Sequence, residues 1–463
     1  MESNDRSIRR AARARIATVL VGLLGLTAQA HAVTLEELAK QLQDLKAQNE
    51  ALQHKVDKLE AAQAQQAQQA PKADQQPAPA PAYSSAGSAG AAPSPAPESD
   101  ESTSIGSYGE IGYTRPSKST DQTNVNIQRA VIFLGHRFDD STKFQSEFEW
   151  ENAITSYADS GEAEVEQLYI EHTFKNGLIA TGGLYLMPAG LINQHHEPTA
   201  YYGVFRPDVD TKIIPSTWRE VGFALAGNTD LGLSWEWGIT TDQSLSGWDP
   251  ASDEGRVRGP LQAIHGEGQF AKAHDVAVHG SLNYRAPGVL LGASAFTGKI
   301  GQQQPDFLAN DARVLLWEIH GRYEPGSWDI AGEYARGTIS NTDALNRSFW
   351  ENTPNPTLVP SLFYGGYLQV AYRFFRDEYF KLTPFARYEI LNTAAEFGNL
   401  SGPLGIPRNP NEKIWTAGLS FFIGNDVVLK ADYRRYKNDQ FPSASPPGWT
   451  KGNSLNLGIG YSF

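Results

Sequence analysis

The chain has 463 residues, with no cysteine, 43 glycines, 10 tryptophans, 19 tyrosines and 21 phenylalanines. The absence of cysteine excludes a disulfide framework, a thiolate metal site and cysteine catalysis, and it suits a chain that crosses an oxidising compartment. The net charge of -13 lies mostly after residue 100, which argues against a nucleic-acid partner.

Residues 1–32 read as a secretory signal peptide. Five arginines between Arg6 and Arg15 precede an apolar run at 16–27, and alanines follow at the alternate positions 28, 30 and 32. No stretch reaches the roughly 20 apolar residues that a membrane-spanning helix needs, so strands would have to hold this chain in a membrane. In a spanning strand the apolar residues alternate with polar ones, so the mean hydropathy of the chain stays low. The value of -0.42 therefore does not argue against membrane-spanning strands.

Residues 33–60 carry a heptad repeat that predicts a coiled coil. The a positions are Leu35, Leu42, Asn49 and Val56, and leucines fill the d positions at 38, 45, 52 and 59. An asparagine at a and leucine at d favour a parallel dimer in isolated peptides, whereas large barrels of the kind predicted below assemble as trimers. We favour the trimer; a lone amphipathic helix on another surface is the alternative.

Residues 61–103 change to Ala/Gln repeats and then to a Pro/Ala/Ser/Gly tract. Such a composition cannot form a packed core. It predicts a semi-rigid linker that holds the coiled coil away from the next domain, on the periplasmic side of an outer membrane.

Residues 104–463 alternate between period-2 segments, short turns and long polar loops. Seven short turns are predicted at 139–141, 175–177, 227–230, 286–288, 324–326, 376–378 and 424–426. Eight long loops are predicted at 114–124, 153–162, 188–218, 241–274, 301–310, 339–360, 393–411 and 439–452. In strict alternation these join 16 antiparallel strands in an all-β transmembrane barrel with both ends in the periplasm. The count treats 261–270 as part of a loop, and 14 or 18 strands are the alternatives.

The last strand shows the alternation most clearly. Leu455, Leu457, Ile459, Tyr461 and Phe463 share one face, and Asn456, Gly458, Gly460 and Ser462 share the other. A strand that is apolar on one side and polar or tiny on the other fits a barrel wall between lipid and water, although a half-buried soluble strand alternates too.

The same alternation predicts which residues face the lumen. The lipid-facing residues of three segments are Phe144, Phe148, Trp150, Leu315, Trp317, Ile319, Val427, Leu429 and Tyr433. The lumen-facing residues are Gln145, Glu147, Glu149, Glu151, Glu318, His320, Arg322, Lys430, Asp432 and Arg434, together with Arg129 on the second strand. Charges of both signs could set up a transverse field that orients a polar solute, or could simply solvate a wide bore.

The third long loop is long but not purely polar. Its apolar residues Ile192, Tyr201, Tyr202, Val204, Phe205, Ile213 and Ile214 are poorly suited to a loop in water, so we expect the loop to fold back against the inner wall and constrict the lumen. The polar groups at this constriction would be His195, His196, Glu197, Arg206, Asp208, Asp210 and Lys212, with Arg219 and Glu220 on the next strand.

No metal, cofactor or catalytic site is predicted. His195, His196 and Glu197 are adjacent in the sequence, and adjacent side chains of an extended loop point apart. The chain has neither a Gly-x-Ser-x-Gly elbow nor a His-Glu-x-x-His helix.

Several short motifs from about residue 105 onward resemble those of a known family. They are Gln128-Arg129-Ala130, the stretch GLYLMP at 183–188, Arg219-Glu220-Val221-Gly222, Asn283-Tyr284-Arg285 and the terminal Tyr461-Ser462-Phe463. In these the chain resembles the phosphate-selective porin O and P family of Gram-negative outer membranes. The resemblance implies a trimeric barrel with the third loop folded inward and with arginine ladders and lysine clusters in phosphate-selective members. Here Met187 stands where the family motif usually has lysine.

Together these features predict an outer-membrane porin that lets small hydrophilic solutes or ions diffuse passively, in contact with outer-membrane lipid and as a homotrimer. Two alternatives remain open: a phosphate- or anion-selective channel, and a structural barrel that tethers the outer membrane through its coiled coil.

Overall fold

The computed structural model describes residues 102–156, 161–377, 379–400, 411–438 and 453–463. They belong to one compact unit, Ser85–Phe463. The predicted signal peptide, the coiled coil and all but the last two residues of the linker lie outside the described residues. Within the described part, no helix is long and apolar enough to cross a membrane.

The described residues form mainly β-strands, as the period-2 segments predict. The strands are β1 (Thr103–Pro116), β2 (Asn124–Arg137), β3 (Thr142–Glu151), β4 (Ala163–Thr173), β5 (Ile179–Leu186), β6 (Arg219–Asn228), β7 (Leu233–Thr241), β8 (Val276–Ala286), β9 (Val289–Lys299), β10 (Arg313–Tyr323), β11 (Trp328–Ser340), β12 (Leu362–Tyr372), β13 (Phe375–Arg376), β14 (Phe380–Glu396), β15 (Glu412–Ile423), β16 (Val427–Asn438) and β17 (Asn453–Ser462).

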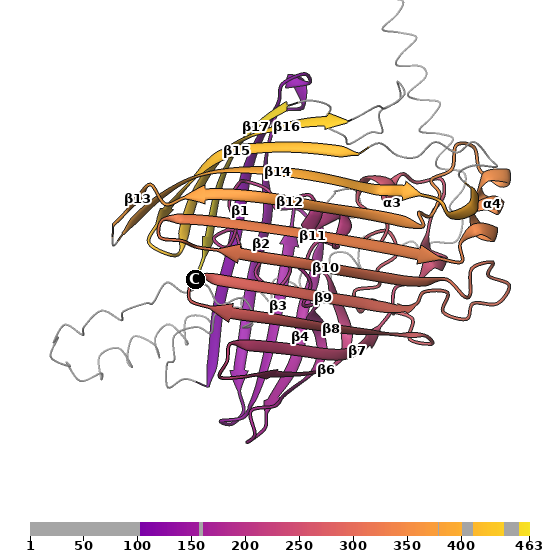
Figure 1. Ribbon diagram of the computed structural model, residues 1–463, viewed down its shortest axis with the longest axis horizontal. Helices are drawn as coiled ribbons and strands as arrows, with labels where there is room; N and C mark the ends of the chain where they lie inside the picture. Colours follow the sequence, from indigo (N-terminus) through magenta and orange to yellow (C-terminus); the bar gives the residue numbers. More distant parts are fainter. Residues whose placement is uncertain (1–101, 157–160, 378, 401–410, 439–452) are drawn as a thin grey trace, which may run out of the picture. The chain divides into compact units, whose positions relative to one another are not determined.

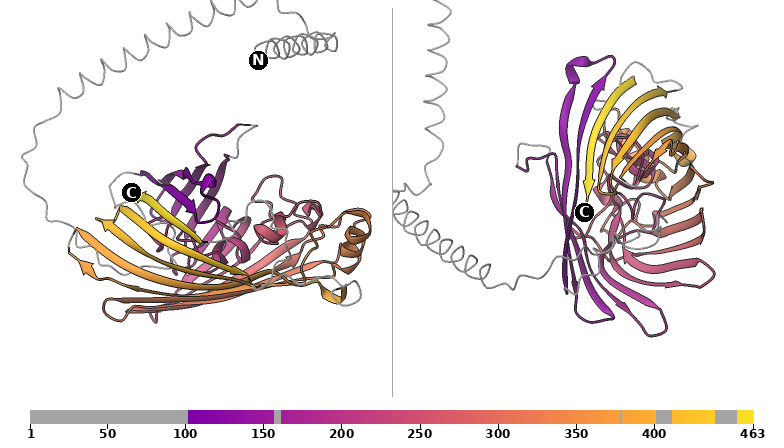
Figure 2. Two further views of the ribbon diagram at one scale, coloured as in Figure 1. Left: turned by 90° about the horizontal axis from the view of Figure 1, so that it is seen from above. Right: turned by 90° about the vertical axis from the view of Figure 1, so that its left-hand side faces the viewer.

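The strands lie side by side in chain order and every pair is antiparallel (Figure 1). β1 pairs with both β2 and β17, which closes the sheet into a barrel; Figure 2 shows indigo β1 beside yellow β17. The two-residue β13 pairs with β14 beyond the end of β12, so β12 and β13 form one line of the wall. The described residues therefore make a closed 16-stranded barrel, which confirms the predicted strand number and its antiparallel order.

Helical segments are short and lie in the connections between strands. They are the α-helices α3 (Glu254–Val257) and α4 (Asp343–Asn352), the 3-10 helices η1 (Thr120–Gln122), η3 (Leu245–Gly247) and η4 (Gly398–Leu400), and the π-helical turn η2 (Val209–Ile213). The segment 261–270 contains no strand, as the alternation of turns and loops requires.

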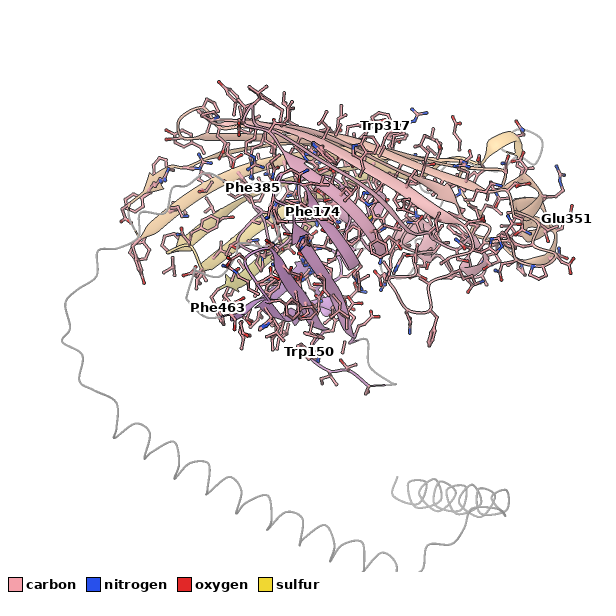
Figure 3. All side chains as sticks on the ribbon, turned by 90° about the horizontal axis from the view of Figure 1, so that it is seen from below. Trp150, Phe174, Trp317, Glu351, Phe385 and Phe463 are labelled. Atoms are coloured by element: carbon pink, nitrogen blue, oxygen red, sulfur yellow. The ribbon has the colours of Figure 1, made fainter. Side chains whose placement is uncertain are left out.

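The two faces of the wall differ as the alternation predicts. Trp150 and Trp317, labelled in Figure 3, are 43% and 36% exposed, while Glu149 and Glu318 beside them in sequence are buried. In the last strand the apolar residues 455, 457, 459, 461 and 463 are exposed and Asn456 is buried. An apolar outer surface and a polar interior are the arrangement of a barrel in lipid.

One part of the interior is less polar than the sequence suggests. At the loop end of β9 to β15, the inner wall carries apolar residues such as Phe296, Leu316 and Phe363. They pack with apolar residues of the loop between β5 and β6 and of the loop after β7, including Leu245 and Leu261. This cluster is the molecule's main apolar core, and it lies inside the barrel.

Candidate functional site

The loop between β5 and β6, residues 187–218 and here called L3, folds into the barrel and reaches distant parts of its wall. The Tyr201 hydroxyl donates to Glu110 on β1 at 2.9 Å, and the Tyr202 hydroxyl donates to Asp329 on β11 at 2.9 Å. The backbone N–H of Val204 donates to Asp432 on β16 at 2.7 Å. L3 therefore spans the interior from its own strands to the opposite wall.

The base of L3 is closed by one side chain, Asn193. Its amide donates to the carbonyls of Met187 and Trp218, both at 2.8 Å, and its oxygen accepts from the Trp218 N–H at 2.7 Å. These bonds satisfy backbone groups where the loop leaves the sheet, and buried polar groups need such partners.

Apolar packing holds the middle of L3 inside the barrel. Val209, Ile213 and Ile214 are fully buried in the core cluster with Trp218. Full burial of a side chain of this kind contributes about 1.5–3 kcal/mol, which explains why this long loop does not stay in water. Of the apolar residues expected to turn inward, Ile213 and Ile214 pack in this cluster, and the others that are buried are Ile192, Tyr201, Tyr202 and Val204.

Two glycines of β17 make room for L3. A Cβ added to Gly460 would lie 2.4 Å from Pro198, and one added to Gly458 would lie 3.2 Å from Val204. The tiny residues on the inner face of the last strand therefore allow the loop to approach the sheet closely.

Two charged groups of L3, Asp208 and Lys212, form ion pairs with the wall of β14 to β16. Asp208 pairs with Lys212 at 3.0 Å and with Arg434 at 2.6 Å. Lys212 also pairs with Glu412 at 3.2 Å, and Arg434 lies 3.4 Å from Glu389.

These neighbours shift the pKa values of the L3 groups. Burial alone would raise the pKa of Asp208, but Lys212 and Arg434 outweigh it and lower this pKa. Burial, assisted by the charge of Glu389, raises the pKa of Asp210 to about 8. L3 thus combines a firmly ionised carboxylate with one that holds its proton near neutral pH.

Beyond β17 and β1 in the closed barrel, β2 to β4 form an acidic surface. Arg129 lies 3.0 Å from Glu110 and 3.5 Å from Glu149. Arg219 of β6 pairs with Glu164 at 2.6 Å and with Glu267 at 3.1 Å.

A β-bulge shapes this acidic surface. The register between β3 and β4 shifts so that Glu147 is opposite Gln167 and Phe148 is opposite Val165, which leaves Glu166 as the extra residue. Glu166 and Gln167 are consecutive and both buried. A bulge turns a side chain in this way where regular alternation would not.

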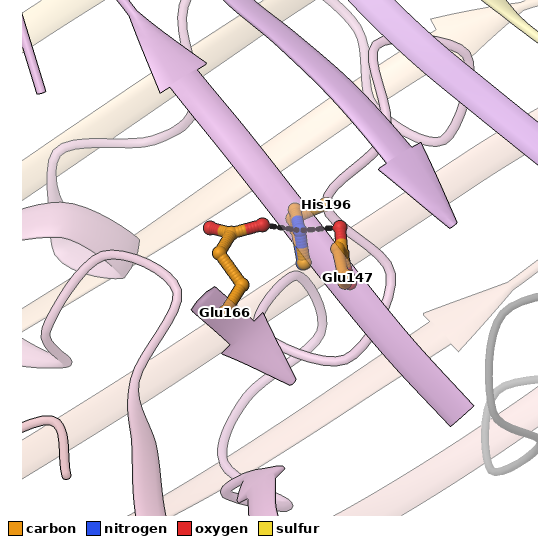
Figure 4. Close-up of side chains that lie close together, drawn as sticks. All are labelled: Glu147, Glu166 and His196. Carbon is orange, nitrogen blue, oxygen red and sulfur yellow. Dashed lines mark ion pairs between the residues drawn. The ribbon is translucent and has the colours of Figure 1, made fainter. Parts of the chain in front are cut away.

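His196 of L3 reaches into the acidic surface (Figure 4). Its Nε2 lies 3.7 Å from Glu147 and 3.7 Å from Glu166, and 2.8 Å from the Tyr108 hydroxyl. Burial opposes a charge on His196, but these two carboxylates outweigh it and raise its pKa to about 10. His196 is therefore the link between L3 and the wall of β3 and β4.

The remaining predicted site residues are dispersed. Burial lowers the pKa of the half-buried His195 to about 4, and Glu197 is also half-buried. Arg206 donates to the hydroxyls of Ser216 and Thr217 within L3, at 3.0 and 2.9 Å. Glu220 accepts from Thr241 at 2.7 Å.

The wall residues predicted for the lumen are buried or partly buried. Glu318 lies 2.9 Å from His320, and Arg322 lies 3.1 Å from Asp329. Lys430 lies over the Tyr201 ring at 3.6 Å. Gln145 and Glu151 are partly buried at the inner face of β3.

Space remains between L3 and the wall of β4 to β8. A cavity of about 130 Å³ is lined there by residues that include Tyr169, Glu171, Tyr185, Gln194, Glu236 and Asn283. None of the described residues that line it is lysine or arginine, and Glu171 pairs with Lys143 at 2.9 Å. A larger hollow of about 400 Å³ is lined by residues at the loop ends of β11 and β12 and by Gly398 and Asn399, with no residue of L3.

Sequence reasoning missed several residues that the structure brings into the site. Glu110, Glu389 and Glu412 occupy inward positions on strands, so the alternation signal could have found them. Glu166 could not be found in this way because its position depends on a bulge. Tyr108 shares the face of Glu110 on β1, so the same alternation could have found it, whereas Asn193 lies in a loop and has no such signal.

The described barrel is similar to solved outer-membrane proteins. OmpF of Salmonella typhi, in complex with daunomycin, superposes with a TM-score of 0.53 at 14% identity, over 78% of this chain and 97% of that one. The outer membrane channel DcaP of Acinetobacter baumannii gives a TM-score of 0.50 at 12% identity, over 78% and 97%. At such identities the likeness establishes the fold.

No family model matches the chain, so its resemblance to the phosphate-selective porin O and P family stays a prediction. An uncharacterized protein of Aquifex aeolicus is 30% identical over 344 residues, which cover 72% of this chain and 76% of the relative. With this identity over most of both sequences, the chain belongs to the same family as the Aquifex aeolicus protein.

Proposed function

We propose that this protein is an outer-membrane channel through which small hydrophilic solutes or ions diffuse passively, and that L3 constricts its lumen. The observation that carries the proposal is the cavity of about 130 Å³ left between L3 and the wall of β4 to β8, inside a closed barrel with an apolar outer surface. No bond is made or broken, so selection rests on size and on the charges along the wall.

The same proposal includes location and assembly. An outer-membrane location in a Gram-negative bacterium is supported by the apolar outer face, and the similar protein DcaP is described as an outer membrane channel. A periplasmic coiled coil and a homotrimer complete the proposal, on the basis of the heptads at 33–60 and the family resemblance.

The charges favour cations over phosphate as the transported ions. The cavity is lined by the carboxylates Glu171 and Glu236 and by no described lysine or arginine. Lys212 and Arg434, which could attract an anion, are paired with Asp208, Glu389 and Glu412. A site for a multiply charged anion needs uncompensated cations, so phosphate or anion selectivity is the weaker alternative.

A structural barrel is the second candidate, and one observation favours it. The apolar cluster of L3, the loop after β7 and the inner wall fills part of the interior at the loop end. A barrel that is obstructed there could serve as an anchor for the periplasmic coiled coil without conducting.

Single-channel recording of the refolded full-length protein in planar bilayers tests these functions together. Zero-current potentials in a salt gradient give the ion preference, and phosphate is then added. Conductance with weak or cation-leaning selectivity, unaffected by phosphate, is expected. Anion selectivity with block by phosphate would overturn the cation preference, and the absence of conductance would favour the structural barrel.

A further inference from the structure

The contact between His196 and the acidic wall of β3 and β4 has the features of a metal site. Glu147, Glu166 and His196 come from β3, β4 and L3, and all three are buried. Each offers one ligand atom, and these atoms lie within 4.8 Å of one another. The sequence predicts no metal here, because Glu147 and Glu166 are far from His196 along the chain.

The ring of His196 is already oriented as a metal ligand would be. Its Nδ1 lies 2.9 Å from the Asn193 carbonyl, which can only accept, so Nδ1 carries a proton and donates it. Metal-binding histidines commonly donate their second ring N–H to a carbonyl, which fixes the tautomer and the ring direction. Nε2 is thereby directed between Glu147 and Glu166 (Figure 4).

The distances from Nε2 to the two carboxylates suit two ligands of one ion better than a hydrogen bond. The hydrogen-bond partner of Nε2 is the Tyr108 hydroxyl at 2.8 Å, and a bound ion would take its place. Nε2 lies 3.7 Å from each carboxylate, beyond the roughly 3.2 Å limit of an N–H···O bond. Two ligands at about 2.0–2.2 Å from a tetrahedral zinc ion are about 3.3–3.6 Å apart. A small adjustment of the side chains would accommodate such an ion.

An unpartnered oxygen points to a missing cation. Glu147 accepts from Gln167 through Oε2, and its Oε1, which faces His196, has no hydrogen-bond partner among the described residues although the side chain is fully buried. Glu166 faces His196 through Oε2, which accepts from Tyr108. Two buried carboxylates therefore face a single imidazole, and a divalent ion would neutralise both of them.

The neighbouring carboxylates are compensated and differ in this respect. Glu164 pairs with Arg219, and Glu149 lies 3.5 Å from Arg129. Arg129 and Arg219 thus pair with Glu149 and Glu164, which form a second acidic group with Glu166, and not with Glu147.

We propose that Glu147, Glu166 and His196 bind a divalent transition-metal ion, which fastens L3 to the wall of β3 and β4. One imidazole nitrogen and two carboxylate oxygens favour zinc over calcium or magnesium, which prefer oxygen ligands alone. A water or another oxygen would complete four-coordination.

Equilibrium dialysis with Zn²⁺ tests the site in the full-length protein, refolded in detergent and stripped with a chelator. Glu166→Gln and His196→Ala are each expected to weaken binding of one zinc ion per chain by at least about tenfold. Glu318→Gln is the matched control, because it removes another buried inner-face carboxylate beside a histidine. Zinc held by exposed histidines elsewhere is common to all four proteins and cancels in the comparison.

Two results would overturn the proposal: wild-type protein that binds no zinc above the level of the His196→Ala variant, or equal binding by the Glu166→Gln variant. Heat-dependent mobility in gels verifies that each barrel is folded. If a variant does not fold, Co²⁺ added to wild-type protein provides a second measurement. A visible absorption band that is abolished by Zn²⁺ but not by Mg²⁺ supports the site. The absence of a band refutes it.

Discussion

The wall of β14 to β16 and the wall of β4 to β8 differ in how they contact L3. The first binds L3 through the ion pairs of Asp208 with Arg434, both buried, and of Lys212 with Glu412. The second leaves a cavity in which L3 contributes only Pro188 and Gln194 to the lining. The difference teaches that charge pairing with β14 to β16, and through His196 with Glu147 and Glu166, fixes the loop. The open space is what remains along the rest of β4 to β8.

The largest expected effect comes from breaking the buried ion pairs of the first wall. Arg434→Leu would leave Asp208 and Glu389 with less compensation, and removing one partner of a buried pair costs about 3–5 kcal/mol. We expect a lower thermal midpoint by circular dichroism and a larger, noisier single-channel conductance as L3 loosens.

Arg435→Leu is the matched control for this change, since Arg435 is the next residue of β16 and is exposed. It should leave both the thermal midpoint and the conductance close to those of the wild type. Equal effects of the two substitutions would show that the ion pairs do not hold L3.

A steric change at β17 should have the next largest effect. Gly460→Ala places a Cβ 2.4 Å from Pro198, so L3 or the strand must move, whereas Gly458→Ala places one at 3.2 Å from Val204. Overpacking costs typically about 1–3 kcal/mol. The thermal midpoint should therefore fall more for Gly460→Ala than for Gly458→Ala, and the reverse order would contradict the close packing of Pro198 on β17.

A pH-dependent effect should come from Asp210 of L3. Its pKa is raised to about 8 by burial and by Glu389, with Glu318 adding to the rise and Arg387 and Arg206 opposing it. In the unfolded chain an aspartate has a pKa of about 3.9, so between pH 4 and 8 the folded state holds a proton that the unfolded state has lost. Stability therefore decreases as pH rises through this window.

Asp210→Asn removes that proton linkage, so its thermal midpoint should change less between pH 5 and pH 8 than that of the wild type. Asp139→Asn, in the turn between β2 and β3, is the control. Hydrogen bonds from Ser141 and Thr142 lower the pKa of Asp139, so its linkage acts below this pH range. An unchanged pH slope in Asp210→Asn would show that Asp210 is ionised in the folded protein.

The physics of a barrel determines which parts of the fold and of the site can be predicted from the sequence. Lipid outside and water inside impose a period of two on every strand, so Leu455 to Phe463 could be placed face by face from the sequence. The inward turn of L3 was also predictable, because Ile213 and Ile214 could not remain in water.

Features that depend on pairing between distant strands could not be predicted. The bulge that turns Glu166 inward depends on the register of β3 and β4, which the alternation within one strand does not show. The apolar inner wall could not be predicted either. Val314, Leu315 and Leu316 are consecutive apolar residues, so no alternation identifies Leu316 as an inward residue.

The smallest expected effect, and the one that tests the open wall directly, comes from Glu236. Glu236→Gln removes one of the two carboxylates lining the cavity, while Glu171 remains. The interaction energy of two unit charges about 4 Å apart in water is about 1 kcal/mol. Loss of one such interaction with a passing cation should lower the cation-to-anion permeability ratio by at most about fivefold. Glu351→Gln, on the exposed surface of α4 (Figure 3), is the control and should leave the zero-current potential unchanged. If both variants keep the wild-type ratio while conductance persists, ions pass the constriction by a route other than the wall of β4 to β8. In that case, the fastening of L3 to β14 to β16 does not determine where the channel is open.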